Sequence, residues 1–213
     1  MSMTKEMTSG KPYKLILSFA IPLILGNVFQ QLYNMVDTVI VGKFVGVNAL
    51  AGVGSTGAIN FLVIGFALGI CSGFSIMIAQ RFGAGDYSGM RKFIANSIYL
   101  CIAVAVILTA VTMLLTKPIL TVMNTPKEIY DYAYNYIIII FAGISATMFY
   151  NILSGILRAV GDSRTPLIFL GVSSVLNVGL DLLCIIVFKM GVAGAGIATV
   201  ISQAISAFLC LIY

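Results

Sequence analysis

The chain has 213 residues, of which 60% are hydrophobic and only 9% are charged, and its formal net charge is +5. Soluble domains carry about 25% charged residues, so this composition excludes a soluble globular fold as well as disordered and collagen-like chains. It fits a membrane protein, in which about 20 apolar residues make one helical span. The absence of histidine also excludes His-based catalytic triads and His-ligated metal sites.

Six apolar segments along the chain predict six membrane-spanning helices joined by short polar connections. The expected fold is an all-α integral membrane protein, a six-helix bundle in which residues 1–213 form one domain. The segments are too long and too continuously apolar for the strands of a membrane barrel. The predicted spans cover about residues 15–41, 50–79, 93–115, 130–157, 167–188 and 192–213.

The lysine and arginine residues predict the orientation of these spans. One side holds Lys5, Lys11, Lys14, Arg81, Arg91, Lys92, Arg158 and Arg164, and the other holds Lys43, Lys117, Lys127 and Lys189. The positive-inside rule places the richer side and the N-terminus in the cytoplasm, so we expect a multi-pass protein of the plasma (inner) membrane. Basic residues that stand singly or in pairs do not indicate a nucleic-acid partner. The apolar end at 208–213, with no polar segment after it, is typical of a fragment of a longer chain.

Two Gly-Asp pairs, Gly85-Asp86 and Gly161-Asp162, follow the second and fourth spans. Repeated halves occur in many transporters. The simpler interpretation is that each glycine ends one helix and each aspartate begins the next turn. The four cysteines all lie inside apolar runs without a CxxC pair, which favours a role as small buried hydrophobic residues.

Two of the seven acidic residues, Asp37 and Asp181, lie inside predicted spans. Asp37 is six residues before Lys43 and Asp181 is eight before Lys189, which puts both carboxylates roughly 9–12 Å below the outer boundary at about 1.5 Å per residue. An ionised group at the bilayer centre costs about 2.5–3.5 kcal/mol, so such acids are usually functional. Two separate spans therefore present an acid at a similar depth.

Other polar residues accompany these acids at helical spacing. They are Asn27, Gln30 and Asn34 before Asp37 in the first span, Asn177 before Asp181 in the fifth, and Thr199 with Gln203 in the sixth. Their oxygens, if they converge, can keep a proton on a buried carboxylate or supply hard ligands to a small cation. Hydrogen bonding between helices is the alternative, and it accounts better for the amides than for the two acids. Pro22 removes a backbone donor and permits either a hinge or a passive kink.

Five ordered stretches together resemble the multidrug and toxic compound extrusion (MATE) transporters, especially the bacterial and archaeal branch similar to the DNA-damage-inducible members. The first span carries Pro22 followed by NVFQQLYNMVDT at 27–38, and AQRFGAGD at 79–86 follows the second span. The remaining stretches are RAVGDSRTP at 158–166, LNVGLD at 176–181 and GAGIAT at 194–199. The resemblance extends over nearly the whole chain.

The resemblance implies a secondary antiporter, not an enzyme, that exports organic and often cationic compounds in exchange for H⁺ or Na⁺ by alternating access. Such transporters have twelve helices in two six-helix lobes, so this chain is similar to the N-terminal lobe, and the C-terminal lobe is absent. The lipid bilayer and the missing lobe are then its partners, and no cofactor other than the coupling ion is expected. The alternatives are a lipid-linked precursor flippase of the same superfamily and a non-transporting membrane assembly subunit.

The resemblance also assigns roles to individual residues. Asp37 and Asp181 would be the coupling carboxylates, and Asn177 and Thr199 would complete the proton network or the Na⁺ site. Tyr33 and Asn151 would lie beside that network, although Asn151 is only seven residues from cytoplasmic Arg158 and requires a long or tilted fourth span. Pro22 would be the bend in the first helix that changes as the carboxylates are loaded. The other polar residues of the expected substrate-facing surface are Asn27, Gln30, Asn34 and Gln203.

Overall fold

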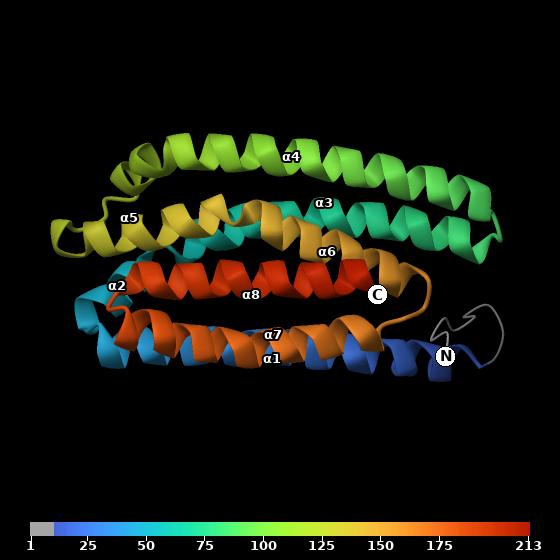
Figure 1. Cartoon of the computed structure of the whole chain (residues 1–213). Coiled ribbons are helices and arrows are strands. Elements are labelled where there is room, and N and C mark those ends of the chain that lie inside the picture. Colours follow the sequence, from blue (N-terminus) through green and yellow to red (C-terminus); the bar gives the residue numbers. More distant parts are fainter. Residues whose placement is uncertain (1–10) are drawn as a thin grey trace.

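The computed structural model describes residues 11–213; Lys5, which contributes to the predicted orientation, lies outside this range. The described residues form a bundle of long helices that run side by side along one axis (Figure 1). The elements are α1 (Pro12–Phe44), α2 (Val47–Ser55), α3 (Gly57–Gly83), α4 (Tyr87–Val122), α5 (Lys127–Ala142), α6 (Ile144–Ala159), α7 (Arg164–Leu182), the π-helical turn η1 (Leu183–Val187) and α8 (Val192–Ile212).

The helices account for the predicted spans in two ways. In the described part of the chain, α1, α3, α4, α7 continued by η1, and α8 are each long and apolar enough to cross a membrane. Helices α5 and α6 meet the same criterion only together, as one span bent by 45°. The bend lies at Gly143, where any larger side chain would collide with Val200 of α8. The expected all-α membrane bundle is confirmed, with its fourth span broken where α8 packs closely against it.

The second predicted span, about residues 50–79, differs from the helices that form. Residues Val47–Ser55 make the separate short helix α2, and the long helix α3 begins only at Gly57. The hydroxyl groups of Ser55 and Thr56 each donate to the backbone carbonyl three residues earlier, at 2.7 Å. Side chains that bond to nearby carbonyls in this way compete with the regular helical pattern. Both helices are apolar, so hydropathy alone did not reveal the break.

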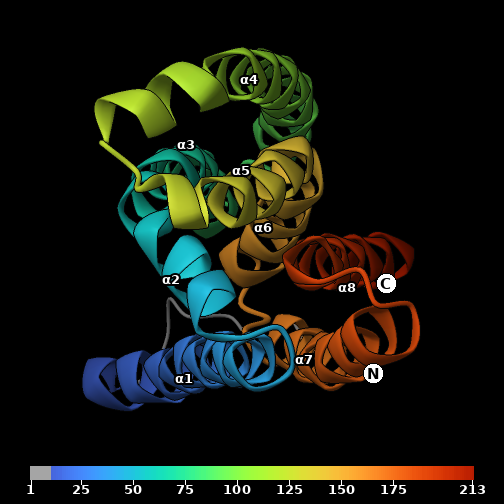
Figure 2. The same cartoon turned by 90° about the vertical axis from the view of Figure 1, so that its left-hand side faces the viewer.

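The packing order is clearest along the helix axes (Figure 2). Helix α6 packs against α3, α4 and α8, and α7 packs between α1 and α8, while α2 packs against α5. Helices α1 and α3 thus lie on one side of the bundle and α4 and α8 on the other. The interior is filled mainly by large apolar side chains of α5 and α6, among them Phe141, Ile144, Met148 and Ile152.

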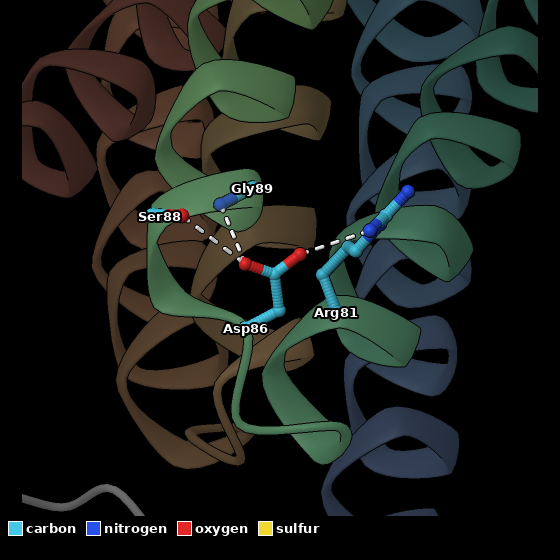
Figure 3. A network of polar contacts seen from close by, with 4 residues as sticks. All are labelled: Arg81, Asp86, Ser88 and Gly89. Atoms are coloured by element: carbon cyan, nitrogen blue, oxygen red, sulfur yellow. Dashed lines mark hydrogen bonds and ion pairs between the residues drawn. The ribbon is translucent and has the colours of Figure 1, made fainter.

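The α3–α4 connection is the first of the two Gly-Asp turns. Gly85 has a φ of +71°, which favours glycine, and the next residue caps α4. The Asp86 carboxylate accepts from the backbone N–H of Gly89 at 2.9 Å and pairs with the Arg81 guanidinium at 2.9 Å, with Ser88 nearby (Figure 3). The Gly89 amide, followed by Arg81, holds the pKa of the Asp86 carboxyl below its usual range.

The α6–α7 connection repeats this arrangement. Gly161 has a φ of +92°, and the buried Asp162 accepts from the backbone N–H groups of Arg164 at 3.1 Å and Thr165 at 3.0 Å. Each acid thus satisfies amide groups of a first helical turn that have no partner within the helix. The interpretation of the Gly-Asp pairs as helix ends and starts is confirmed at both turns.

Candidate functional site

The two acids of the predicted spans meet inside the bundle. Asp37 of α1 is 7% exposed and Asp181 of α7 is 0% exposed. Their carboxyl groups lie within hydrogen-bonding reach of each other. Ionised carboxylates are acceptors only, so this contact requires a proton on one of the two groups or a cation that offsets their repulsion.

Several buried polar atoms around this pair have no hydrogen-bond partner in the described protein. They are Oδ1 of Asp37, both carboxylate oxygens of Asp181, both amide atoms of Asn177 and the hydroxyl of Thr199. Buried polar groups are normally paired, because an unpaired one costs about 1–3 kcal/mol. Asn177 lies one turn before Asp181 on the same buried stripe of α7, and α8 packs against that helix. The protein therefore leaves several oxygens around the two acids without a protein partner.

Tyr33 connects α1 to α8 next to the acids. The side-chain amide of Gln203 donates to the Tyr33 hydroxyl at 3.3 Å, and Gln30 also lies within hydrogen-bonding reach of that hydroxyl. Tyr33 is buried and interacts electrostatically with Asp37, one turn further along α1. The structure thus brings Tyr33, Gln30 and Gln203 together with the carboxyl pair.

Tyr136 of α5 is a member of this cluster that the sequence analysis missed. Its side chain is buried, and it interacts electrostatically with Asp37, Asp181 and Tyr33. A signal for it does exist in the sequence. Residues 133, 136, 137 and 140 follow the spacing of one helical face, and all four are buried, so a tyrosine in this series has to place its hydroxyl inside the bundle.

Other predicted site residues lie outside the contacts around the acids. Asn151 of α6 is half-buried and donates to the carbonyl of Thr147 in its own helix, at 2.7 Å. Asn27 and Asn34 are exposed on α1, so the polar stripe of this helix is divided between the interior and the surface. Pro22 lies within α1, which is continuous through it, 15 residues or about 22 Å from Asp37.

The backbone changes immediately after the site. Helix α7 ends at Leu182, and the next five residues form the π-helical turn η1, so the change begins two residues beyond Asp181. Turns of π-helix are rare in proteins, and those that occur are often found at functional sites. Residues of this stretch read as a continuous apolar span in the sequence, and no residue pattern distinguished the turn from ordinary α-helix.

The chemistry of the cluster suits a small hard cation or a proton. Two carboxyl groups, one amide and one hydroxyl are oxygen donors of the kind that such cations prefer. Within residues 11–213, no three cysteine, aspartate or glutamate side chains gather as a group that could hold a metal ion. The arrangement thus differs from a high-charge transition-metal centre, and the four cysteines of the chain are buried free thiols.

Comparisons with known proteins agree with this description. The family model MatE matches residues 22–183. The chain is 33% identical over 208 residues to the probable multidrug resistance protein YpnP of Bacillus subtilis, covering 98% of this chain and 47% of YpnP. A crystal structure of MATE in the bent conformation matches with a TM-score of 0.85 and 30% identity, over 94% of this chain and 45% of that one. The straight conformation matches with a TM-score of 0.87 and 29% identity, over 99% and 46%. The chain thus spans about half the length of the curated relatives it matches.

Proposed function

The chain belongs to the MatE family of multidrug efflux transporters, and we propose that it forms the N-terminal lobe of an antiporter that exchanges H⁺ or Na⁺ for organic, often cationic, compounds. The members found by comparison are transporters rather than enzymes, and several apolar helices make this a multi-pass membrane protein. The observation that carries the proposal is the contact between Asp37 and Asp181 inside the bundle, surrounded by oxygens without protein partners.

Ion loading at this pair would change the energy of the bundle. Two unprotonated carboxylates in contact repel each other, and a proton or Na⁺ removes that repulsion. The repulsion acts between α1 and α7, which otherwise pack along much of their length. A ligand can shift a conformational equilibrium only if it binds the two states with different affinity. An ion between Asp37 of α1 and Asp181 of α7 would bind more tightly to the state in which the two carboxylates are close together. Asn177, Thr199 and Tyr33 are proposed to support this ion, whereas Asn151, which is bonded within α6, is left out of this role.

Helix α1 is the element on which this energy would act. Few of its residues are buried, and its main neighbour is α7. Pro22 has no backbone N–H to donate, so the helix can bend there at lower cost. Relatives have been solved in a bent and in a straight conformation. We therefore assign to Pro22 the hinge through which ion loading at Asp37 reaches the cytoplasmic half of α1.

A second lobe would complete the transporter. The relatives are about twice as long as this chain. Helix α1 exposes Asn27 and Asn34, and α3 exposes glycines at which a larger side chain would meet no other atom: Gly65, Gly69 and Gly73. Small residues allow helices to approach closely in membranes. We assign the contact with the second lobe, and the substrate path between the lobes, to these faces of α1 and α3. The excess of basic residues at the end with the N-terminus supports our proposal that this end lies in the cytoplasm.

Export of a fluorescent cation such as ethidium tests this proposal. The chain is joined to the C-terminal half of YpnP, and efflux is followed in cells under an imposed proton or sodium gradient. We expect gradient-driven efflux that is lost when Asp37→Asn and Asp181→Asn are combined and kept when the exposed acid of α5 is changed, Asp131→Asn. Coupled export by the double variant would refute the assignment of the acids. Transport of lipid-linked sugars in place of cations would support the flippase alternative instead.

A further inference from the structure

A groove on the side of the bundle away from α1 and α3 has no part in the proposed transport. It lies between α4, α6 and α8, with a volume of about 390 Å³. Figure 2 shows these three helices together on one side, with α6 set between the other two. The lining is almost entirely apolar, and the residues with polar side-chain atoms are Ser145 and Cys101. The groove is therefore separate from the polar cluster around the acids.

The groove has a buried floor, to which Met148 and Ile152 of α6 contribute, and an exposed rim. Ala105 and Ala207 are buried on the floor, whereas Ile102, Val106 and Phe208 are exposed at the rim. Its mouth therefore continues into the exposed apolar surface of α4 and α8. On a membrane-spanning bundle, such a surface faces hydrocarbon.

The depth of the groove restricts what can enter it. Its residues on α4 run from Ile98 to Val106, and α4 has no charged residue between Lys92 and Lys117. This uncharged stretch spans roughly 36 Å at 1.5 Å per residue, enough to cross a hydrocarbon core about 30 Å thick. The groove thus lies at the level of lipid tails, and the headgroups are beyond its ends.

We propose that this groove binds one acyl chain of a bilayer lipid. An empty apolar cavity loses the dispersion contacts of its lining, and a hydrocarbon chain restores them. A chain in the groove touches three helices, whereas a chain on the convex face of α4 touches one, so the groove retains its lipid longer. With so few polar atoms in the lining, recognition is by the tail and is insensitive to the headgroup.

The test uses the absence of tryptophan from the chain, so that one introduced tryptophan is the sole such fluorophore. Val106→Trp places it at the rim, and Ile107→Trp places it on the adjacent residue of α4, outside the lining; the two positions are 60% and 62% exposed. Each variant of the chain is reconstituted in phosphatidylcholine with brominated acyl chains, which quench tryptophan, and is then transferred to dodecyl maltoside. We expect tryptophan at either position to be quenched in the bilayer. After transfer to detergent, the quenching that remains at position 106 should be at least twice that at position 107.

Filling the groove provides the matched control. Ala204 is exposed and lines the groove, while Ala103 is exposed on α4 outside it, so Ala204→Leu and Ala103→Leu add the same atoms at different places. In the Val106→Trp background, Ala204→Leu should remove the retained quenching and Ala103→Leu should leave it. Equal recovery of tryptophan fluorescence at positions 106 and 107 after transfer would show that lipid exchanges freely at both positions, and would overturn the proposal. Absence of quenching at 106 in the bilayer would show that protein, such as a second copy, covers the groove, and would also overturn it.

Discussion

Acidic residues occupy two contrasting regions of this bundle. In the Gly-Asp turns, Asp86 and Asp162 accept hydrogen bonds from backbone N–H groups at the starts of α4 and α7. In the interior, Asp37 and Asp181 contact each other, and three of their four oxygens are buried without a protein donor. The aspartate side chain therefore meets at least two donors in each turn, although Oδ2 of Asp162 is buried without a partner, and almost none in the interior.

The difference separates structural acids from acids that are available to an ion. A carboxylate at a helix start stabilises the fold, because amide groups there have no other partner and the helix dipole favours negative charge. A buried carboxylate without donors destabilises the fold and is retained for another reason. Substitutions of the two kinds of acid should consequently change the stability of the bundle in opposite directions.

The largest effect is expected in the interior. Asp181→Asn keeps the side-chain shape and removes a buried carboxyl group whose ionised form has no donor, so it should raise the free energy of unfolding by about 1–3 kcal/mol. The measurement is the midpoint of unfolding by dodecyl sulfate, followed by circular dichroism in micelles. Asp131→Asn, on the exposed surface of α5, serves as the control and should leave the midpoint unchanged. A loss of stability in Asp181→Asn would place this acid with the structural group.

The buried turn acid should respond with the opposite sign. Asp162→Ala leaves two backbone N–H groups without their acceptor and should lower the free energy of unfolding by about 1–2 kcal/mol in the same titration. Asp162→Asn keeps one acceptor oxygen, so its free energy of unfolding should lie between those of Asp162→Ala and the native chain. If Asp162→Ala proved neutral, the hydrogen bonds at the start of α7 would contribute nothing, and the contrast between the two regions would fail.

The exposed turn acid gives a smaller and pH-dependent effect. The pKa of Asp86 is lowered in the folded chain, first by the Gly89 amide and then by Arg81. Its stabilising contribution is therefore complete above the ordinary aspartate pKa of about 3.9 and is lost as the pH falls through the lowered value. Thermal melts of the native chain and Asp86→Ala should differ at pH 6 and converge toward pH 2. Curves that stay parallel over this range would contradict the proposed role.

The smallest effect concerns the ion pair of the same turn. Arg81 and Asp86 are both substantially exposed, so solvent and salt weaken their attraction. Arg81→Gln should shift the unfolding midpoint less than Asp86→Ala, and added salt should remove the remaining difference. A larger effect of Arg81→Gln would show that the ion pair, and not the backbone amide of Gly89, holds this turn.

The sequence predicted some features of the site well and others poorly. The distances of Asp37 and Asp181 from Lys43 and Lys189 predicted acids at similar depth, and the structure brings these acids into contact. Depth can be counted along a helix because each residue adds the same rise. Tyr136 was missed, although its spacing puts it on one face of α5 with Ala133 and Ile140, because the groups that this face meets depend on how α5 packs against its neighbours.

By itself, the sequence determined that this is a membrane bundle of long helices, that two turns begin with a capping aspartate, and which two acids lie within the spans. These properties follow from apolar length, local hydrogen bonding and residue counting, which act along the chain. Only the tertiary structure decided that α2 is separate from α3, that the fourth span bends at Gly143, and that the polar stripe of α1 is divided between interior and surface. The bend and the divided stripe depend on the neighbouring helix that a side chain meets, and such contacts join residues far apart in the sequence. The break before α3 has local hydroxyl bonds of Ser55 and Thr56, which hydropathy does not register.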